Sequence, residues 1–353
     1  MPASARLRLA IAVLLLSTAA PAGSPPAAPT PAASPPGAPP PTAPPPARTP
    51  LGIALEGLAY PFPTRDLSFS VEGQDVRMAY FEVPPSGPSN GRAVLLLHGK
   101  NFWGAYWEGP ARALSAAGFR VIVPDQLGFG KSSKPDIHYS FDGFASNTAR
   151  LLDALGVRRA VVVGHSMGGM LAVRFARNYP ERTEKLVLEN PIGLEDYRFV
   201  IPPIPLEQLY RDELEQTPEA YLDYIRHYFV RWDSKWEGLA EVRARIALSG
   251  EFPRWARSSA LTYQMIYQQP VRHELPLIAV PTLLIIGQAD RTAVGKRYAS
   301  AEAKKTLGDY PALGRAAAKD IPGAKLVEIP GVGHIPHLEA EPAFERALLD
   351  FLR

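Results

Sequence analysis

The amino-acid sequence predicts an α/β domain built on a mainly parallel, eight-stranded sheet with helices on both faces. Short, nearly continuous apolar runs recur from about residue 51 to the C-terminus, as in strands that helices bury on both sides. Amphipathic stretches with helical spacing separate several of these runs. Two segments with alternating apolar and polar residues precede the runs, which is typical of an antiparallel pair at a sheet edge.

Each expected strand is marked by its apolar pattern and by the polar or glycine residues that bound it. The antiparallel pair is expected at residues 67–71 and 76–83. The strands buried on both faces are expected at residues 93–97, 119–123, 160–163, 185–188, 281–286 and 325–329.

The clearest helix between these strands is expected over residues 141–155. Its apolar stripe recurs every three to four residues and consists of Phe144, Thr148, Leu151, Leu152 and Leu155. Ser140 has a side chain suited to cap the first turn, and Gly156 can adopt the left-handed conformation that commonly ends a helix.

The alternation of strands and helices stops between about residues 191 and 276. This stretch is rich in Tyr and Trp, namely Tyr210, Tyr221, Tyr224, Tyr228, Trp232, Trp236, Trp255, Tyr263 and Tyr267. It predicts helices inserted between two strands, in a segment long enough to cover a site as a cap. Most of these aromatic side chains are expected to pack within the insertion itself.

Composition restricts the classes of function. The chain has 353 residues, 46% of them apolar and 21% charged, with a formal net charge of +3. No block of basic residues is interleaved with aromatic ones, so we expect no nucleic-acid partner. Cysteine is absent from the sequence, which excludes disulfides, thiol nucleophiles and thiolate metal sites. We expect no cofactor and no metal site.

Residues 1–22 have the pattern of an export signal. Arg6 and Arg8 precede an apolar run over residues 9–16, and residues 20–22 form a small-x-small cleavage site. This run is shorter than the roughly 20 residues that a membrane span needs. We therefore expect a periplasmic or secreted protein without a stable membrane span after processing.

Residues 23–50 are mostly Pro, Ala, Ser and Thr. A segment of this composition cannot form a packed core and is expected to be an extended, disordered linker. The folded domain is then expected over residues 51–353.

A nucleophile is indicated by Gly164-x-Ser166-x-Gly168, which follows a buried apolar run and precedes a helical stretch reaching about Asn178. A sharp strand-to-helix turn of this kind lifts a serine hydroxyl above the sheet edge. The start of the following helix favours a developing negative charge there. Ser166 is the expected nucleophile.

A serine hydroxyl needs a base to take its proton, and that base needs a carboxylate to orient it. Asp290 and His334 each follow a later apolar run, so the order along the chain is Ser, Asp, His. Glu189 is an alternative acid. His337 is an alternative base, but it lies where a helix is expected to begin.

The loop that follows residues 93–97 reads His98-Gly99-Lys100-Asn101. Backbone N–H groups of Lys100 and Met167 are expected to form an oxyanion hole, with Asn101 as the alternative to Lys100. We expect the Lys100 side chain to face solvent.

Together these residues resemble the α/β-hydrolase superfamily over about residues 65–353. The matching motifs are His98-Gly99, Asp125-x-x-Gly128-x-Gly130-x-Ser132, Gly164-His165-Ser166-Met167-Gly168-Gly169, Asp290 and Gly333-His334. The order of elements resembles members with a single cap, which include carboxylesterases, lactonases and carbon–carbon bond hydrolases. In those members the insertion after the sixth strand covers the pocket.

Two departures narrow the resemblance. Epoxide hydrolases and haloalkane dehalogenases carry an aspartate where this chain has Ser166. Proline iminopeptidases usually have His-Gly-Gly-Pro-Gly where this chain has His98-Gly99-Lys100-Asn101-Phe102. The resemblance therefore implies a serine hydrolase acting on a carboxylic ester or related acyl substrate. The aromatic residues of the expected cap indicate a small-to-medium substrate that is apolar or aromatic. Carbon–carbon bond hydrolysis of a diketone-like substrate, acyl transfer and non-catalytic binding are the alternatives.

Overall fold

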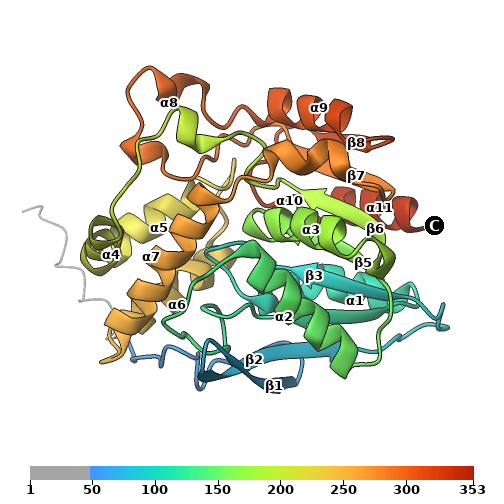
Figure 1. Ribbon diagram of the computed structural model, residues 1–353, viewed down its shortest axis with the longest axis horizontal. Coiled ribbons are helices and arrows are strands. Elements are labelled where there is room, and N and C mark those ends of the chain that lie inside the picture. Colours follow the sequence, from blue (N-terminus) through green and yellow to red (C-terminus); the bar gives the residue numbers. More distant parts are fainter. Residues whose placement is uncertain (1–47) are drawn as a thin grey trace, which may run out of the picture. The chain divides into compact units, whose positions relative to one another are not determined.

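Eight strands form one sheet in the computed structural model, which describes residues 48–353 (Figure 1). The strand order is β1-β2-β4-β3-β5-β6-β7-β8. The pairs β1–β2 and β2–β4 are antiparallel, and the other neighbours are parallel. The predicted mainly parallel sheet with an antiparallel edge is therefore confirmed. The expectations for residues 1–22 and 23–47 lie outside the described residues.

The strands are β1 (Thr64–Val71), β2 (Gln74–Val83), β3 (Ala93–Leu97), β4 (Arg120–Pro124), β5 (Ala160–His165), β6 (Thr183–Glu189), β7 (Thr282–Gly287) and β8 (Lys325–Ile329). All eight overlap the expected segments. β1 begins earlier than expected because backbone pairing with β2 extends to Thr64 and Phe81. The first residues of β1 are largely exposed, so they carry no apolar signal in the sequence.

Helices cover both faces of the sheet. The side chains of β3 alternate between two cores: Leu95 and Leu97 pack with the residues of one, Val94 and Leu96 with those of the other. On the first face lie α2 (Phe141–Ala154), α3 (Met167–Asn178) and α9 (Tyr310–Asp320). On the second face lie α1 (Glu108–Ala116), α10 (Pro336–Glu339) and α11 (Glu341–Leu352).

The ends of α2 follow the sequence prediction. The Ser140 Oγ accepts a hydrogen bond of 3.0 Å from the Gly143 N–H, which caps the first turn. The helix ends at Ala154, and Gly156 beyond it has a φ of +67°. Both predicted end residues are confirmed, although the helix is one residue shorter than expected.

The insertion lies between β6 and β7 and is helical, as predicted. Its helices are α4 (Leu206–Glu215), α5 (Pro218–Arg226), α6 (Glu237–Ile246) and α7 (Phe252–Gln268). They gather to one side of the sheet, on the left in Figure 1. Leu51, Ile53 and Leu55 pack into an apolar cluster with residues of α6 and α7.

The remaining helical segments are short. They are α8 (Ala303–Thr306) and the 3₁₀ segments η1 (Gly104–Trp107), η2 (Pro180–Arg182), η3 (Tyr197–Phe199), η4 (Ser234–Trp236), η5 (Arg272–Leu277) and η6 (Lys296–Tyr298). Within residues 48–353, no helix has both the length and the apolar character needed to cross a membrane.

Candidate active site

Ser166 occupies the sharp turn between β5 and α3. Its backbone has φ +56° and ψ −120°, a conformation that costs energy in a residue other than glycine and is common at functional sites. The flanking glycines permit the turn, because a Cβ on Gly164 would lie 2.2 Å from the carbonyl oxygen of Gly168. The turn therefore needs glycine at position 164, and the strand–turn–helix context expected for Ser166 is confirmed.

The structure brings Ser166, His334 and Asp290 together. The Ser166 Oγ lies 3.0 Å from the His334 Nε2, and the His334 Nδ1 lies 2.7 Å from the Asp290 Oδ2. Only 7% of Ser166, 1% of His334 and 2% of Asp290 is exposed. The ionised Asp290 carboxylate can only accept hydrogen bonds, so the proton between it and His334 is on the His334 Nδ1. The Nε2 of a neutral His334 ring can then accept the proton of the Ser166 hydroxyl.

The Asp290 carboxylate accepts hydrogen bonds from several neighbouring groups. Its Oδ2 also accepts from the Asn190 Nδ2 at 2.7 Å, and its Oδ1 accepts from the Thr292 N–H at 2.8 Å. Burial alone would raise the pKa of Asp290, but its electrostatic interaction and hydrogen bond with His334, together with the hydrogen bonds from Thr292 and Asn190, outweigh it and hold the pKa below its ordinary value. Asp290 is therefore ionised at neutral pH and suited to stabilise a charged His334.

Glu189, the alternative acid, pairs with His337 and not with His334. The Glu189 Oε1 accepts from the His337 N–H at 2.7 Å, and the His337 Nδ1 lies 2.9 Å from both carboxylate oxygens. The His337 ring stacks on Trp107 with 4.2 Å between centroids. Since His337 is held in this separate pair, it does not reach Ser166. Within residues 48–353, no group of three or more His, Asp or Glu side chains could hold a metal ion.

The loop after β3 lies against the nucleophile. An ideal Cβ on Gly99 would lie 3.1 Å from the Ser166 Cβ, so a larger residue there would crowd the serine. In the described part of the chain, the backbone N–H groups of Met167, Lys100 and Asn101 form no hydrogen bond to another backbone group. These N–H groups are free to donate to a substrate oxygen, and Lys100 and Asn101 remain the two possibilities on this loop.

The prediction that the Lys100 side chain faces solvent is wrong. Its ammonium donates to the Ser259 Oγ at 2.7 Å and lies 3.7 Å from the Glu213 Oε1. Only 12% of the side chain is exposed. Ser259 belongs to α7 and Glu213 to α4, so the inserted helices cover this part of the loop. Nothing in the local sequence around Lys100 shows that cover.

A buried series of hydrogen bonds, which we call the relay, connects the loop after β3 with the turn that carries His334. The Gly99 N–H donates to the Tyr106 Oη at 2.9 Å, and the Tyr106 Oη lies 2.9 Å from the His165 Nδ1. The His165 Nε2 lies 2.8 Å from the His334 carbonyl oxygen, which can only accept. Burial and the electrostatic influence of the neighbouring His334 and His337 side chains hold the pKa of His165 well below its ordinary value, so its ring is neutral. The Nε2 therefore donates, and the Nδ1 accepts from Tyr106.

Replacing Tyr106 with phenylalanine is expected to destabilise the protein by about 1–3 kcal/mol, because it leaves the buried Gly99 N–H and His165 Nδ1 without a partner. Urea unfolding followed by circular dichroism measures this change. Tyr263→Phe is the matched control: the Tyr263 hydroxyl is buried without a partner in the described chain, so its loss should leave stability unchanged or slightly raised. Equal losses in both variants would show that the relay contributes nothing.

Tyr228 connects the insertion to the site. Its carbonyl oxygen accepts from the His334 N–H at 2.7 Å, and its ring lies 4.8 Å from the His334 ring between centroids. Its hydroxyl accepts from the Asn101 Nδ2 at 2.7 Å. The sequence predicts that most aromatic residues of the insertion pack within it, and the contact of Tyr228 with His334 departs from that prediction. Asn190 was also missed, although a polar residue directly after a buried strand is a usable signal.

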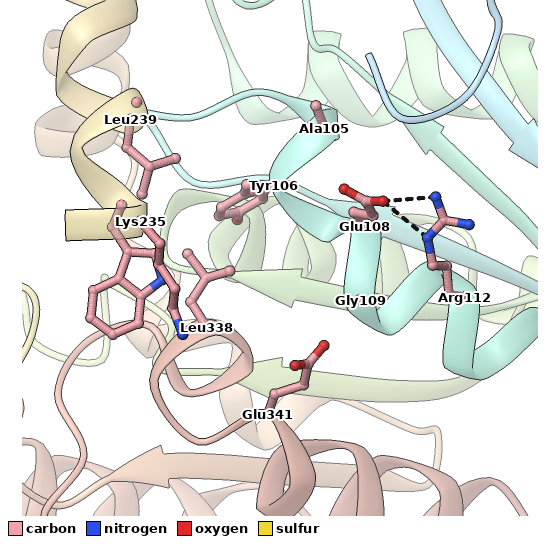
Figure 2. Close-up of a pocket in the computed structure, with 11 residues that line it drawn as sticks. Ala105, Tyr106, Glu108, Gly109, Arg112, Lys235, Leu239, Leu338 and Glu341 are labelled. Atoms are coloured by element: carbon pink, nitrogen blue, oxygen red, sulfur yellow. Dashed lines mark hydrogen bonds and ion pairs between the residues drawn. The ribbon is translucent and has the colours of Figure 1, made fainter. Parts of the chain in front are cut away.

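A hollow in the described structure is lined by residues other than Ser166, His334 and Asp290. It has a volume of about 490 Å³ and lies between α1, the start of α6 and the α10–α11 turn (Figure 2). The Glu108–Arg112 ion pair at 2.7 Å lies on its α1 side, and Tyr106, Leu239 and Leu338 give it apolar walls.

The chain matches a known protein family and resembles a solved structure. The family model described as alpha/beta hydrolase fold matches residues 92–341. A solved structure, a probable hydrolytic enzyme from Pseudomonas aeruginosa PAO1, is 45% identical. The match covers 87% of this chain and 99% of that chain, with a TM-score of 0.85.

Curated relatives match at lower identity. A 2-hydroxy-6-oxononadienedioate/2-hydroxy-6-oxononatrienedioate hydrolase from Burkholderia vietnamiensis is 31% identical over 80% of this chain and 93% of its own length. A 2-hydroxy-6-oxo-6-phenylhexa-2,4-dienoate hydrolase from Burkholderia cepacia is 29% identical over 78% of this chain and 92% of its own length. An uncharacterized protein of Mycobacterium tuberculosis is 39% identical over 114 residues, so the match spans only 32% of that relative's length.

Proposed function

Because the chain belongs to the alpha/beta hydrolase fold family, we propose that it is a serine hydrolase that cleaves a carboxylic ester or a related acyl substrate. The observation that carries this proposal is the continuous hydrogen-bonded series from the Ser166 Oγ through His334 to Asp290, at 3.0 and 2.7 Å. A nucleophile, a base and an orienting acid in this arrangement are what acyl transfer requires.

In the proposed first step, the Ser166 Oγ attacks the substrate carbonyl carbon while its proton moves to the His334 Nε2. The carbonyl oxygen becomes an oxyanion, which accepts hydrogen bonds from the Met167 N–H and from the Lys100 or Asn101 N–H. The imidazolium then protonates the leaving alcohol as the bond to it breaks, which leaves an acyl group on Ser166. Asp290 stabilises the imidazolium while it carries the charge.

In the second step, water replaces the alcohol. His334 takes a proton from the water, the hydroxide attacks the acyl carbon, and the imidazolium returns a proton to the Ser166 Oγ as the carboxylic acid leaves. The hydrogen bonds through Tyr106 and His165 connect the loop that carries the proposed oxyanion donors to the turn that carries His334. They would therefore hold the donors and the base in a fixed relative position during both steps. We propose that the substrate carries an apolar or aromatic acyl or alcohol group, since the Tyr228 ring lies 4.8 Å from the His334 ring and 6.0 Å from the Phe102 ring between centroids.

A fluorophosphonate probe tests the proposal directly, because it reacts with an activated serine much faster than with an ordinary hydroxyl group. We expect one adduct on the peptide that contains Ser166, detected by mass spectrometry, and turnover of p-nitrophenyl esters of graded acyl length. Labelling should fail in protein inactivated by Ser166→Ala. An adduct on another serine, with Ser166 unmodified, would show that the nucleophile is misassigned.

Carbon–carbon bond hydrolysis is the second candidate, and the names of the two Burkholderia relatives favour it. The same residues would act on a ketone carbonyl of a 2-hydroxy-6-oxo dienoate. The loss of absorbance of such a dienoate measures this reaction. Rapid cleavage of the dienoate, together with negligible turnover of every p-nitrophenyl ester, would favour this candidate over the esterase proposal.

A further inference from the structure

The loop that follows β3 contains a tight turn. The Phe102 N–H donates to the Gly99 carbonyl oxygen at 3.2 Å, so residues 99–102 form a β-turn with Lys100 and Asn101 at its centre. We call residues 99–102 the oxyanion turn, because the two central residues carry the candidate oxyanion donors. Neither central N–H bonds to another backbone group among the described residues. Contacts of the side chains must therefore hold the middle of the oxyanion turn in place.

The side chain of Asn101 bonds to the insertion. Its Nδ2 donates to the Tyr228 Oη at 2.7 Å, and the Tyr228 hydroxyl donates to the Tyr224 Oη at 2.5 Å. Tyr224 belongs to α5, and Tyr228 follows shortly after that helix ends. Tyr228 is buried, so water competes little for these hydrogen bonds. Because the side chain of asparagine is short, a bond at its end also restrains its backbone.

The side chain of Lys100 bonds to two other helices of the insertion. Its ammonium donates to the Ser259 Oγ of α7 at 2.7 Å, and the Ser259 hydroxyl donates to the Glu213 Oε1 of α4 at 2.7 Å. Ser259 is buried, as is most of the Lys100 side chain. A lysine is rarely buried unless its charge is paired. The insertion supplies that pairing, so both central residues of the oxyanion turn are fastened to it.

Tyr228 is itself fixed against the base. Its carbonyl oxygen accepts from the His334 N–H at 2.7 Å, and a Cβ on Gly333 would lie only 2.3 Å from that oxygen. This close approach requires glycine at position 333. The backbone and ring of Tyr228 thus contact the turn that carries His334, while its hydroxyl contacts Asn101. One residue of the insertion therefore relates the base to the oxyanion turn.

We propose that the insertion positions the oxyanion donors, and that Tyr228 and Ser259 are its positioning residues, each acting through its hydroxyl group. A donor stabilises the tetrahedral intermediate only when it lies about 2.7–3.1 Å from the oxyanion. A loosened oxyanion turn would therefore stabilise the transition state less while the ground state still binds. This inference rests on the proposed hydrolase function and adds residues of the insertion to its machinery.

The test removes one hydroxyl at a time, by Tyr228→Phe and by Ser259→Ala. Each variant is expected to lower kcat/KM for p-nitrophenyl butyrate by about ten-fold, less than the loss of a whole donor. The inhibition constant of hexyl trifluoromethyl ketone should rise by a similar factor, because its adduct with a serine carries an oxyanion. The inhibition constant of octan-2-ol, which forms no adduct, should stay unchanged.

Tyr267→Phe and Ser258→Ala are the matched controls, because each removes a hydroxyl of α7 that bonds elsewhere. The Tyr267 Oη donates to the Ile201 carbonyl oxygen at 2.9 Å, and the Ser258 Oγ accepts from the Tyr139 Oη at 3.3 Å. Both controls are expected to keep the wild-type kcat/KM and inhibition constants. Melting temperatures by circular dichroism identify any variant that fails to fold. Equal losses of kcat/KM in test and control variants would overturn the proposal.

A double-mutant cycle tests whether the Tyr228 hydroxyl acts through Asn101. Asn101→Ala removes the side-chain amide and keeps the backbone N–H. If both residues act through the one hydrogen bond, Asn101→Ala combined with Tyr228→Phe should lose no more kcat/KM than the worse single variant. Losses that multiply would contradict the positioning role of Tyr228.

Hydrogen exchange separates this proposal from the proposed function. The Gly99 and Phe102 N–H groups are both hydrogen-bonded, so their exchange reports opening of the oxyanion turn. Faster exchange in Tyr228→Phe and Ser259→Ala than in the two controls supports the anchoring of the turn, even if no ester is hydrolysed and the hydrolase proposal fails. Ester hydrolysis at equal kcat/KM in all variants, with equal exchange, would leave the hydrolase proposal standing and refute the positioning role.

Discussion

Replacing Ser166 with alanine is expected to lower kcat/KM for p-nitrophenyl butyrate by about 10⁴-fold or more. The substitution removes the only atom that can form the acyl intermediate at this turn. It leaves the oxyanion donors and the binding surface in place, so a residual rate above that of the uncatalysed reaction should persist. Steady-state hydrolysis, followed by the absorbance of p-nitrophenolate, measures the loss.

The fold should tolerate this substitution, because the Ser166 Oγ bonds only to His334 among the described residues. The melting temperature of Ser166→Ala should therefore stay within a few degrees of that of the wild type. Ser249→Ala, in the turn between α6 and α7, serves as the control and should keep full activity. Equal activity in the wild type and in Ser166→Ala would place the ester hydrolysis at another residue.

Replacing Asp290 with asparagine is expected to lower kcat by about 10⁴-fold at neutral pH. The two carboxylate oxygens accept from His334 and Asn190 on one side and from Thr292 on the other. An amide NH₂ group in place of either oxygen would face a donor. If it faces His334, Nδ1 must become an acceptor and Nε2 must carry the proton. The Nε2 could then no longer take the proton of Ser166.

The pH dependence of the protein's stability is expected to reflect the ionisation of Asp290. The pKa of Asp290 is lower in the folded protein than in the unfolded chain, so its ionised form contributes stability above its unfolded pKa. That contribution is lost as the pH falls through the folded pKa, and urea unfolding at acidic pH should show it. In Asp290→Asn, stability should depend less on pH over this acidic range.

A matched control uses Asp153→Asn, because the Asp153 side chain is exposed and pairs with Arg182 instead of with a residue of the site. It should retain kcat within about two-fold. Glu189→Gln tests the alternative acid named in the sequence analysis, which pairs with His337. If Asp290→Asn kept most of its activity while a folded Glu189→Gln protein lost it, Glu189 would be the orienting acid.

The sequence by itself determined the fold class and much of the site. Strands buried on both faces leave continuous apolar runs, so the parallel strands were visible without any tertiary information. Both ends of α2 were visible in the sequence, because Ser140 caps the first turn and Gly156 adopts a positive φ just after the last turn. Each of these effects involves only neighbouring residues in the chain. Ser166, Asp290 and His334 could be singled out because each follows a strand, and parallel strands end at one edge of the sheet.

Only the tertiary structure decided which partners these residues take. Glu189 and Asp290 both follow buried strands, and the three-dimensional arrangement assigns the first to His337 and the second to His334. The side chain of Lys100 is buried because helices more than a hundred residues away cover it. Periodicity and turn chemistry report on contacts between near neighbours in the chain. Burial and ion pairing depend on segments that meet only after folding, so the sequence pattern holds no local record of them.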